Sequence, residues 1–238
     1  MSDNQAKDFL GLLIFSSLPV LIFGLLDDFH FTVPPIYRLF AASISSLIAV
    51  FFLETWLVKV DVIVLDQLFF YTPFAIFFTV FATTGVSHAF NVIDGLHGLS
   101  LGVSLAVSFF LTVLAWLNSD VFVVMLSLVF FLSSLGLFLL NYPWGKIFLG
   151  DGGAYFQGHC LSWISIILLS RNPEITPWAI VLIFFWPVVE TLYSIFRRIS
   201  KKTSSAIADR AHFHQLVYDK VKSFKIFGYS STIANSFS

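Results

Sequence analysis

A carboxylate set among glycines opens one of the long apolar stretches of this chain. Asp151 lies in the segment Phe148-Leu149-Gly150-Asp151-Gly152-Gly153, directly before the apolar run 154–170. Glycines let a backbone turn sharply and approach a ligand, and the free N–H groups of a helix that starts there would face the same point. A phosphate or a metal-bound ligand fits such a place. The alternative is a glycine turn in which Asp151 only caps the helix.

Two further polar clusters carry groups of related chemistry. Asp27 and Asp28 end the first apolar run, where adjacent carboxylates resist desolvation unless a cation or a proton accompanies them. Asn91 and Asp94 offer an amide oxygen and a carboxylate, which are ligands that Mg²⁺ or Mn²⁺ prefers. The alternatives are a solvated pair at the membrane boundary for the first cluster and a polar interhelical loop for the second.

Basic and imidazole groups follow near the end of the chain. Arg210, His212 and His214 alternate in a segment behind a basic, serine-rich linker. They suit a phosphate clamp better than a zinc site, because no third and fourth soft ligand lies nearby. The alternative is a surface helix of mixed charge. Glu190, seven residues before Arg197, is an isolated carboxylate for which we expect a structural partnership.

The elements that must position these groups are membrane helices. The 238 residues are 58% hydrophobic and 11% charged, with a mean hydropathy of +0.89, whereas a soluble domain has about 25% charged residues. Apolar runs of bilayer length indicate helices, because lipid cannot satisfy the exposed backbone groups of open strands. The sequence therefore predicts an all-α, polytopic transmembrane helix bundle of about seven spans, at residues 9–26, 39–53, 68–86, 99–117, 121–140, 154–170 and 178–196.

The order of the spans predicts where the polar segments lie. If each run crosses once, segments 27–38, 87–98 and 141–153 and the tail from Arg197 share one face. Only Lys7, Lys59 and Arg171 of the 13 lysines and arginines fall on the other face. Because Lys and Arg mark the cytoplasmic side, we expect a multi-pass membrane protein with its polar loops in the cytoplasm.

Two regions follow from this organisation. Residues 1–196 are expected to form the transmembrane bundle with cytoplasmic catalytic loops, and residues 197–238 a basic cytoplasmic segment that carries the Arg-x-His-x-His motif. A basic tail beside a bilayer is explained by attraction to the membrane surface, so no nucleic-acid partner is expected.

Five short motifs in this order resemble the polyprenyl-phosphate N-acetylhexosamine-1-phosphate transferases, or glycosyltransferase family 4. This family includes undecaprenyl-phosphate GlcNAc-1-phosphate transferase and phospho-MurNAc-pentapeptide translocase. The resemblance runs from about residue 9 to residue 218. The motifs are Gly24-Leu25-Leu26-Asp27-Asp28, Asn91-Val92-Ile93-Asp94-Gly95-Leu96-His97-Gly98-Leu99, Lys146-Ile147-Phe148-Leu149-Gly150-Asp151-Gly152-Gly153, Val189-Glu190-Thr191-Leu192 and Arg210-Ala211-His212-Phe213-His214.

The resemblance implies a Mg²⁺-dependent enzyme of cell-envelope polysaccharide biosynthesis in the bacterial inner membrane, with Mn²⁺ as an alternative ion. Such an enzyme transfers an N-acetylhexosamine 1-phosphate from a UDP-sugar to a polyprenyl (undecaprenyl) phosphate in the membrane and releases UMP. Whether the protein forms a homodimer is left open. Carried over by motif, Asp151 and Asn91 would be metal ligands and Asp27, Asp28 and Asp94 catalytic. Substrate contacts would come from Arg38, Gly95, Lys146, Gly150, Arg210, His212 and His214.

The chain also departs from the family pattern. His97 stands where many members have Asp or Asn, and Phe31 replaces a third Asp of the aspartate-rich motif. The family usually has more spans, so the chain resembles its motif-bearing middle. A truncated, non-catalytic membrane remnant therefore stays open, as does an ion-coupled transporter suggested by Glu190. The clustering of acids on one face argues against the transporter.

Overall fold

The structure is a computed structural model that describes residues 3–201. All regular secondary structure in this part of the chain is α-helical, as predicted. The helices are α1 (Asp3–Asp28), α2 (Pro35–Leu53), α3 (Ile63–Phe69), α4 (Thr72–Ile93), α5 (Leu99–Leu117), α6 (Val121–Asn141), α7 (Gly150–Arg171), α8 (Pro177–Ile183) and α9 (Phe185–Lys201).

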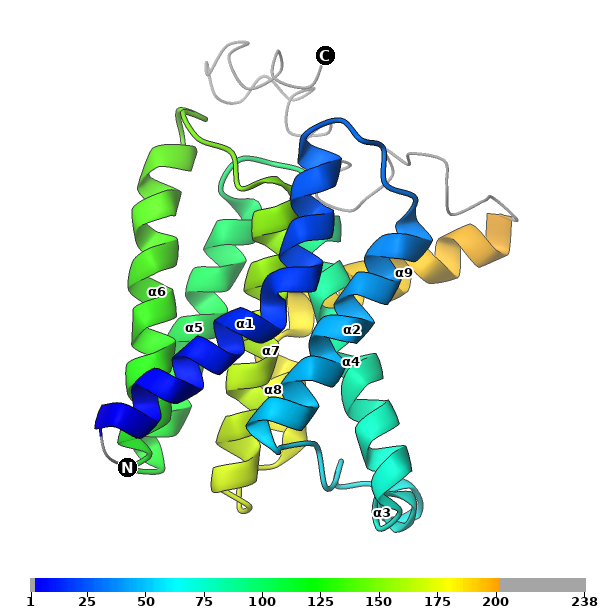
Figure 1. The fold of residues 1–238 in the computed structure, drawn as a ribbon, viewed down its shortest axis with the longest axis vertical. Helices are drawn as coiled ribbons and strands as arrows, with labels where there is room; N and C mark the ends of the chain where they lie inside the picture. The colour runs from blue at the N-terminus through cyan, green and yellow to red at the C-terminus, as the bar shows by residue number, and fades with distance from the viewer. Residues whose placement is uncertain (1–2, 202–238) are drawn as a thin grey trace, which may run out of the picture.

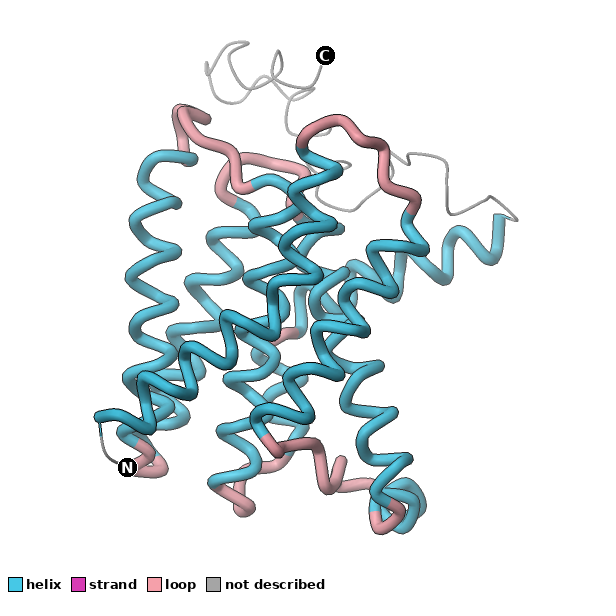
Figure 2. The backbone as a smooth tube through the Cα atoms, in the orientation of Figure 1, coloured by secondary structure: helices cyan, strands magenta, loops and turns pink. Residues whose placement is uncertain are grey.

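Helix α7 is the axis of the bundle. It packs against α1, α2, α4, α5 and α6, and Figure 1 shows it between the α5–α6 pair on one side and α2 with α4 on the other. Trp163, Ile164 and Leu168 on α7 are completely buried. The loops gather at the two ends of the bundle, as the tube in Figure 2 shows, so each end can assemble side chains from several helices.

The predicted fold class, an all-α bundle of membrane-length helices, is confirmed. Helices α1, α2, α4, α5 and α6 are long and apolar enough to cross a bilayer, and α8 with α9 would together make a sixth crossing. Helix α7 contains the predicted run 154–170 and has a comparable length of 22 residues. Its interior carries polar side chains such as Gln157 and His159, both buried by neighbouring helices. The prediction of about seven spans is thus roughly met.

The third predicted span is displaced along the chain. The expected run 68–86 is replaced by the short helix α3 and by α4, which begins with Pro73 in its first turn and continues to Ile93. Proline is favoured at this position because the first turn leaves its N–H groups without helical partners. The extension places His88 and Asn91 on the last turns of a helix, with Asp94 as its C-terminal cap.

The last predicted span is wrong as a single straight helix. Helices α8 and α9 meet at an angle of 78°, next to Phe184. Pro187 explains the break, because it lacks the N–H that would bond to Ile183 and its ring clashes with that turn. Helix α9 then continues to Lys201, so no helix boundary separates residues 196 and 197.

Helix α9 turns its polar side toward the protein. Glu190, Ser194 and Arg197 are buried, while Leu192 and Phe196 are exposed. Since α9 packs on α4, the polar stripe lies against the bundle and the apolar side faces outward, as a lipid environment requires. The predicted shared face of Glu190 and Arg197 is present.

Small and hydroxyl-bearing residues hold the helices close together. The Thr83 hydroxyl donates to Ser46 at 2.8 Å and joins α4 to α2. A Cβ atom on Gly158 would lie 2.7 Å from the Cα of Ser87, so α7 and α4 almost touch. Because lipid supplies no hydrophobic drive between helices, such close packing and hydrogen bonds stabilise the bundle.

Candidate active site

Three of the predicted polar segments meet at one end of the bundle. Helix α1 ends there, α2 begins, α4 ends and α7 begins, at the end opposite the N-terminus in Figure 1. Asp28 is bonded to the first turn of α7, and Asp94 interacts electrostatically with both Asp28 and Asp151. Segments 27–38, 87–98 and 141–153 therefore share one face, as the span order predicts.

A close crossing of α1 and α7 builds the centre of this site. A Cβ atom on Gly24 would lie 2.5 Å from the Cα of Gly152, so a glycine on α1 is needed for this contact. Gly150 has a φ of +71°, and a Cβ atom there would lie 2.7 Å from Oδ2 of Asp28. Both glycines thus serve the approach of Asp28 to the start of α7.

The anion at the start of α7 is the carboxylate of Asp28. The N–H of Asp151 donates to Oδ1 of Asp28 at 2.7 Å, and the N–H of Gly152 donates to Oδ2 at 3.0 Å. Asp28 therefore caps a helix from another part of the chain and complements its dipole. The alternative in which Asp151 caps its own helix does not hold, since the N-cap position is Leu149.

Arg38 joins the other two carboxylates of the site. Its Nη1 donates to Oδ2 of Asp27 at 2.8 Å and to Oδ2 of Asp151 at 2.6 Å. Asp27 also accepts the backbone N–H of Val33 at 2.9 Å. The Asn91 side chain is hydrogen-bonded to the Asp151 carboxylate. One guanidinium thus bridges two acids that lie 124 positions apart in the chain, with the amide of a third segment beside them.

Asp94 shows that the site has an excess of negative charge. Burial and the negative charges of Asp151 and Asp28 raise the pKa of Asp94 from its usual 3.8 to about 7. A carboxyl group in such surroundings takes up a proton unless a cation arrives. Perturbed acids of this kind are typical of functional sites.

The remaining predicted residues lie on the loops around this network. Gly95 follows Asp94 directly, between α4 and α5. Lys146 lies between α6 and α7, with Nζ 5.6 Å from the centre of the Trp144 ring. Arg210, His212 and His214 lie outside the described residues. Their predicted part in substrate binding therefore stays a prediction, and so do the roles assigned to the others.

Asn141 is a residue that the sequence analysis missed. It ends α6, accepts the N–H of Gly98 through its side-chain oxygen and donates to the carbonyl of Ile147 at 2.7 Å. It thereby ties the loop after α4 to the loop before α7. His97 packs on Phe148 across the same two loops, with ring centres 5.0 Å apart. An asparagine at the end of an apolar run is the signal that could have found it.

The donor atoms of the site suit a hard divalent cation. Asp27, Asp151 and Asn91 offer oxygen ligands, and the two carboxylates are already grouped around one positive charge. Oxygen ligands of this type are those that Mg²⁺ takes. Within residues 3–201, however, no three His, Cys, Asp or Glu side chains are arranged to hold a metal ion. Arg38 is bonded to Oδ2 of Asp151, so an ion would bind through the other oxygen of this carboxylate.

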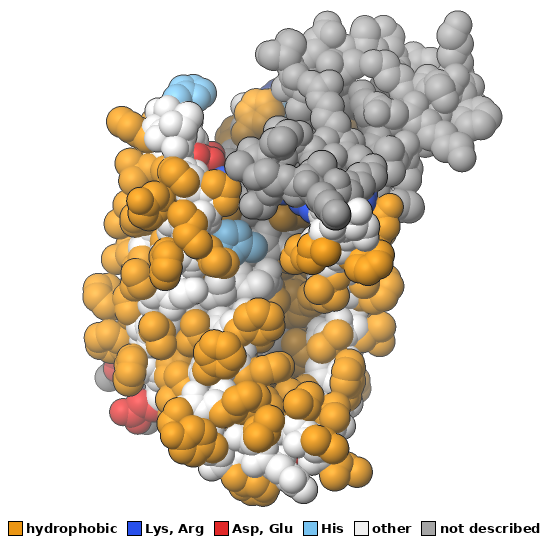
Figure 3. All heavy atoms as spheres, turned by 90° about the vertical axis from the view of Figure 1, so that its right-hand side faces the viewer, with side chains coloured by type: hydrophobic (Ala, Val, Ile, Leu, Met, Phe, Trp, Pro, Cys, Tyr) orange, Lys and Arg blue, Asp and Glu red, His pale blue; other side chains and the backbone are white. Residues whose placement is uncertain are grey.

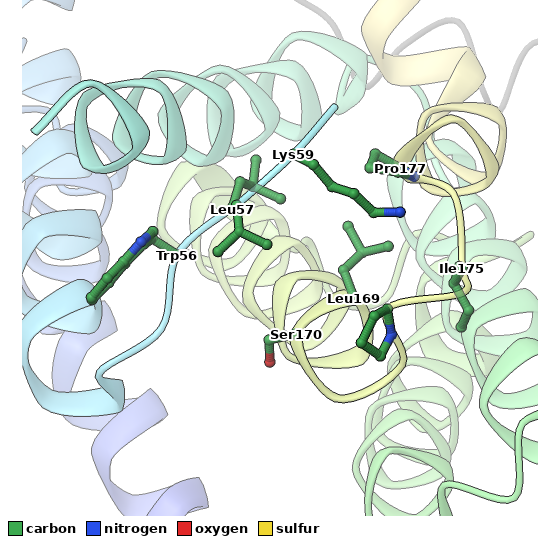
Figure 4. A pocket seen from close by; sticks show the side chains of 9 residues that line it. Trp56, Leu57, Lys59, Leu169, Ser170, Ile175 and Pro177 are labelled. Atoms are coloured by element: carbon green, nitrogen blue, oxygen red, sulfur yellow. The ribbon is translucent and has the colours of Figure 1, made fainter. Parts of the chain in front are cut away.

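A pocket at the opposite end of the bundle is a separate feature. It has a volume of about 190 Å³ and lies between the segment after α2 and the end of α7 (Figure 4). Leu57, Lys59, Leu169 and Pro177 line it. It contains none of the clustered acids and is smaller than ordinary ligand pockets of about 300–1,000 Å³.

Comparison with known proteins places the chain in a family. Residues 10–169 match the model of glycosyl transferase family 4. The chain is 34% identical to a probable undecaprenyl-phosphate N-acetylglucosaminyl 1-phosphate transferase of Bacillus subtilis, over 57% of this chain and 38% of the relative. It is 30% identical to an undecaprenyl-phosphate alpha-N-acetylglucosaminyl 1-phosphate transferase of Thermotoga maritima, over 91% of this chain and 67% of the relative.

A third relative extends the comparison to a second kind of enzyme. The chain is 33% identical to a phospho-N-acetylmuramoyl-pentapeptide-transferase of Lactobacillus johnsonii, over 53% of this chain and 38% of the relative. It thus spans under half the length of the Bacillus and Lactobacillus proteins and 67% of the Thermotoga protein. Because the family model covers most of its residues and all the described helices up to α7, this multi-pass membrane protein belongs to glycosyl transferase family 4.

Proposed function

We propose that this protein transfers an N-acetylhexosamine 1-phosphate from a UDP-sugar to a polyprenyl phosphate and releases UMP. The observation that carries the proposal is the meeting of Asp27, Asp28, Asp94, Asp151 and Arg38 at one end of a membrane bundle of this family. Relatives of the chain are named for transfer to undecaprenyl phosphate. A site at the end of the bundle suits a reaction between a soluble and a lipid substrate.

The chemistry of the reaction matches the charges of the site. Phosphoryl transfer depends mainly on positioning and on electrostatic stabilisation of the transferring group. The acceptor phosphate has a second pKa of about 6, so it is largely ionised at neutral pH and needs no strong base. Asp28 has both oxygens bonded to α7, which favours a role in holding α1 against α7. Asp27 and Asp94 are the better candidates for contact with substrate.

Mg²⁺ is the cofactor that the donor atoms favour, with Mn²⁺ as an alternative. Asp151 and Asn91 would hold it, and Asp27 lies beside them. When bound, the ion would supply positive charge to the phosphate oxygens of the donor. Arg38 bonds Asp27 and Asp151 through Nη1 alone, so its other terminal nitrogen would be available to phosphate oxygens, for which a guanidinium is well suited.

The outer surface beside the site favours a lipid acceptor. Figure 3 shows a vertical hollow on the face that lies at the right of Figure 1, with hydrophobic side chains on both walls. Exposed apolar residues of the helices in this region include Phe40 and Ile44 on α2, Phe81 on α4, and Leu192 and Phe196 on α9. A polyprenyl chain could lie along such a surface while its phosphate reaches the acidic end. The bias of Lys and Arg favours the cytoplasm for that end.

A direct assay tests the proposal. Purified full-length protein is incubated with Mg²⁺, undecaprenyl phosphate and a panel of UDP-N-acetylhexosamines, and UMP and lipid-linked sugar are measured. We expect both products in equal amounts with at least one donor. If neither forms with any donor while the protein stays folded in detergent or nanodiscs, the enzyme assignment is wrong.

A further inference from the structure

Two buried side chains lie directly beneath the acidic network. Tyr155 is one turn after Asp151 on α7, and His88 is one turn before Asn91 on α4. The Tyr155 hydroxyl lies 3.3 Å from Nδ1 of His88. The two rings meet edge to face, with centres 5.0 Å apart. They therefore form one unit below the two residues that the chain offers to a metal ion.

Tyr155 touches the helices that carry the rest of the site. It is only 2% exposed and packs in a cluster with Val20 of α1 and Ala42 of α2. Ala42 is one turn after Arg38, and Val20 is two turns before Asp27. The close contact of Gly158 with α4 brings His88 to the same level. Tyr155 is thus in contact with α1, α2 and α4, three helices whose ends supply acidic-site residues.

His88 extends the unit toward Arg38. Its Nε2 is buried without a hydrogen-bond partner among the described residues, and the ring lies close to the backbone of Arg38. If the tyrosine O–H donates to Nδ1, the proton of the neutral imidazole lies on Nε2.

Within residues 3–201, the guanidinium of Arg38 is held at one point only. Its guanidinium is bonded to Asp27 and Asp151 through the same nitrogen, Nη1. Its Nε is buried and has no hydrogen-bond partner within the part of the chain that the structure describes. A guanidinium held through one nitrogen can pivot, so the surfaces packed against it determine where it lies. Both the His88 and the Tyr155 ring lie within electrostatic range of its charge.

We propose that His88 and Tyr155 are positioning residues that set Arg38 against Asp27 and Asp151. They touch no reacting atom themselves and act through the guanidinium. The inference rests on the proposed function, because its effect on turnover presupposes the transfer reaction.

Substitutions that remove or keep the hydrogen-bonding groups of Tyr155 and His88 test the pair. Tyr155→Phe deletes only the hydroxyl, and we expect kcat to fall about tenfold, since misplacement of a group by 1 Å can cost as much as about 10²-fold. The KM for the UDP-sugar should stay within about twofold. His88→Asn keeps an acceptor near the position of Nδ1 and should retain most of the activity, whereas His88→Leu should resemble Tyr155→Phe. Tyr71→Phe, an exposed tyrosine at the other end of α4, is the matched control.

Testing Tyr155→Phe again in a protein that carries Arg38→Lys separates a positioning role from an effect on general stability. Arg38→Lys keeps a positive charge but loses the planar guanidinium. If Tyr155 acts through Arg38, Tyr155→Phe should lower kcat by less than about twofold in the Arg38→Lys protein. An equal loss in both backgrounds would show that the hydroxyl contributes only to the fold, and full activity of Tyr155→Phe would also overturn the proposal.

A structural readout tests the pair independently of activity. In an experimental structure of the Tyr155→Phe variant, the Arg38 guanidinium should be displaced from the Asp151 carboxylate relative to the unsubstituted protein. An unmoved Arg38 would refute the positioning role. This result distinguishes the two proposals, because it can be obtained even if the unsubstituted protein forms no lipid-linked sugar.

Discussion

The two ends of the bundle differ in how far buried acidic residues are neutralised by their neighbours. At the end away from the site, Asp120 accepts hydrogen bonds from Arg171 at 2.7 Å and Asn172 at 3.1 Å. Burial alone would raise the pKa of Asp120, but these bonds outweigh it and lower the pKa. At the site end, Asp27 and Asp151 share Arg38, and burial with neighbouring charge raises the pKa of Asp94 to about 7.

The difference separates structure from function in one molecule. Asp120 and Arg171 balance each other and tie the start of α6 to the end of α7, so this acid is neutralised within the fold. Among the described residues, the acidic end has more negative charge than its partners neutralise. Such an imbalance costs stability and persists where a cation or a charged substrate is to be bound. Matched substitutions at the two ends test this difference.

The largest effect is expected at Asp151. Asp151→Asn removes the charge that would bind Mg²⁺, and we expect turnover to fall by about 10³-fold with loss of Mg²⁺ dependence. Insertion into the membrane should be unchanged. Turnover is measured as UMP release over a Mg²⁺ titration, and near-normal rates in this variant would remove Asp151 from the metal site.

A substitution in the α1–α7 crossing should have the next largest effect. In Gly24→Ala the new Cβ atom would meet the backbone of Gly152 at 2.5 Å, which forces α1 away from α7. Overpacking of this kind costs about 1–3 kcal/mol, and the displaced Asp28 should lower activity by about 10²-fold. Gly11→Ala on the same helix is the control, because nothing lies within 4 Å of its Cβ position. Equal activity of the two variants would contradict this account of the crossing.

Asp120→Asn should reverse the pattern seen at Asp151. The loss of its charge weakens the bond to Arg171, so we expect a loss of about 1–2 kcal/mol in stability. UMP release per folded molecule should match that of the unsubstituted protein, because Asp120 lies at the far end. Thermal unfolding and the transfer assay together check this, and a selective loss of activity would mean that the two ends are coupled.

The smallest expected effect is that Asp94 makes the stability of the metal-free protein depend on pH. Because the pKa of Asp94 is raised in the folded protein, the folded state holds a proton there more tightly than the unfolded state does. The stabilisation from this proton is fully present below the usual pKa of 3.8 and is lost as the pH rises through about 7. The melting temperature of Asp94→Asn should therefore decline less over this range than that of the unsubstituted protein, and parallel curves would refute the assignment.

Much of the architecture could be predicted because it depends on simple rules. Apolar length predicts helices, and the order of spans predicts that segments 27–38, 87–98 and 141–153 share a face. The bend before α9 was missed, although Pro187 in the middle of the run was a visible signal. The extension of α4 to Ile93 was missed because polar residues such as His88 and Asn91 interrupt the apolar pattern on which the prediction relied.

The contacts within the site could not be predicted in the same way. Asp28 caps α7 only because two glycines let α1 and α7 cross closely, and that contact depends on tertiary packing. Arg38 has no sequence signal that pairs it with both Asp27 and Asp151. Tyr155 stands in an apolar run where an aromatic residue suggests lipid contact, yet it is buried beneath the acids.

The most direct test of the unbalanced acidic end is a count of bound divalent cations. Mn²⁺ binding to the purified full-length protein is followed by electron paramagnetic resonance, with Mg²⁺ as competitor. The account predicts a saturable site that Mg²⁺ displaces, that Asp151→Asn abolishes and that Asp120→Asn leaves intact. Absence of saturable binding by the folded protein, or equal binding by the two variants, would contradict it.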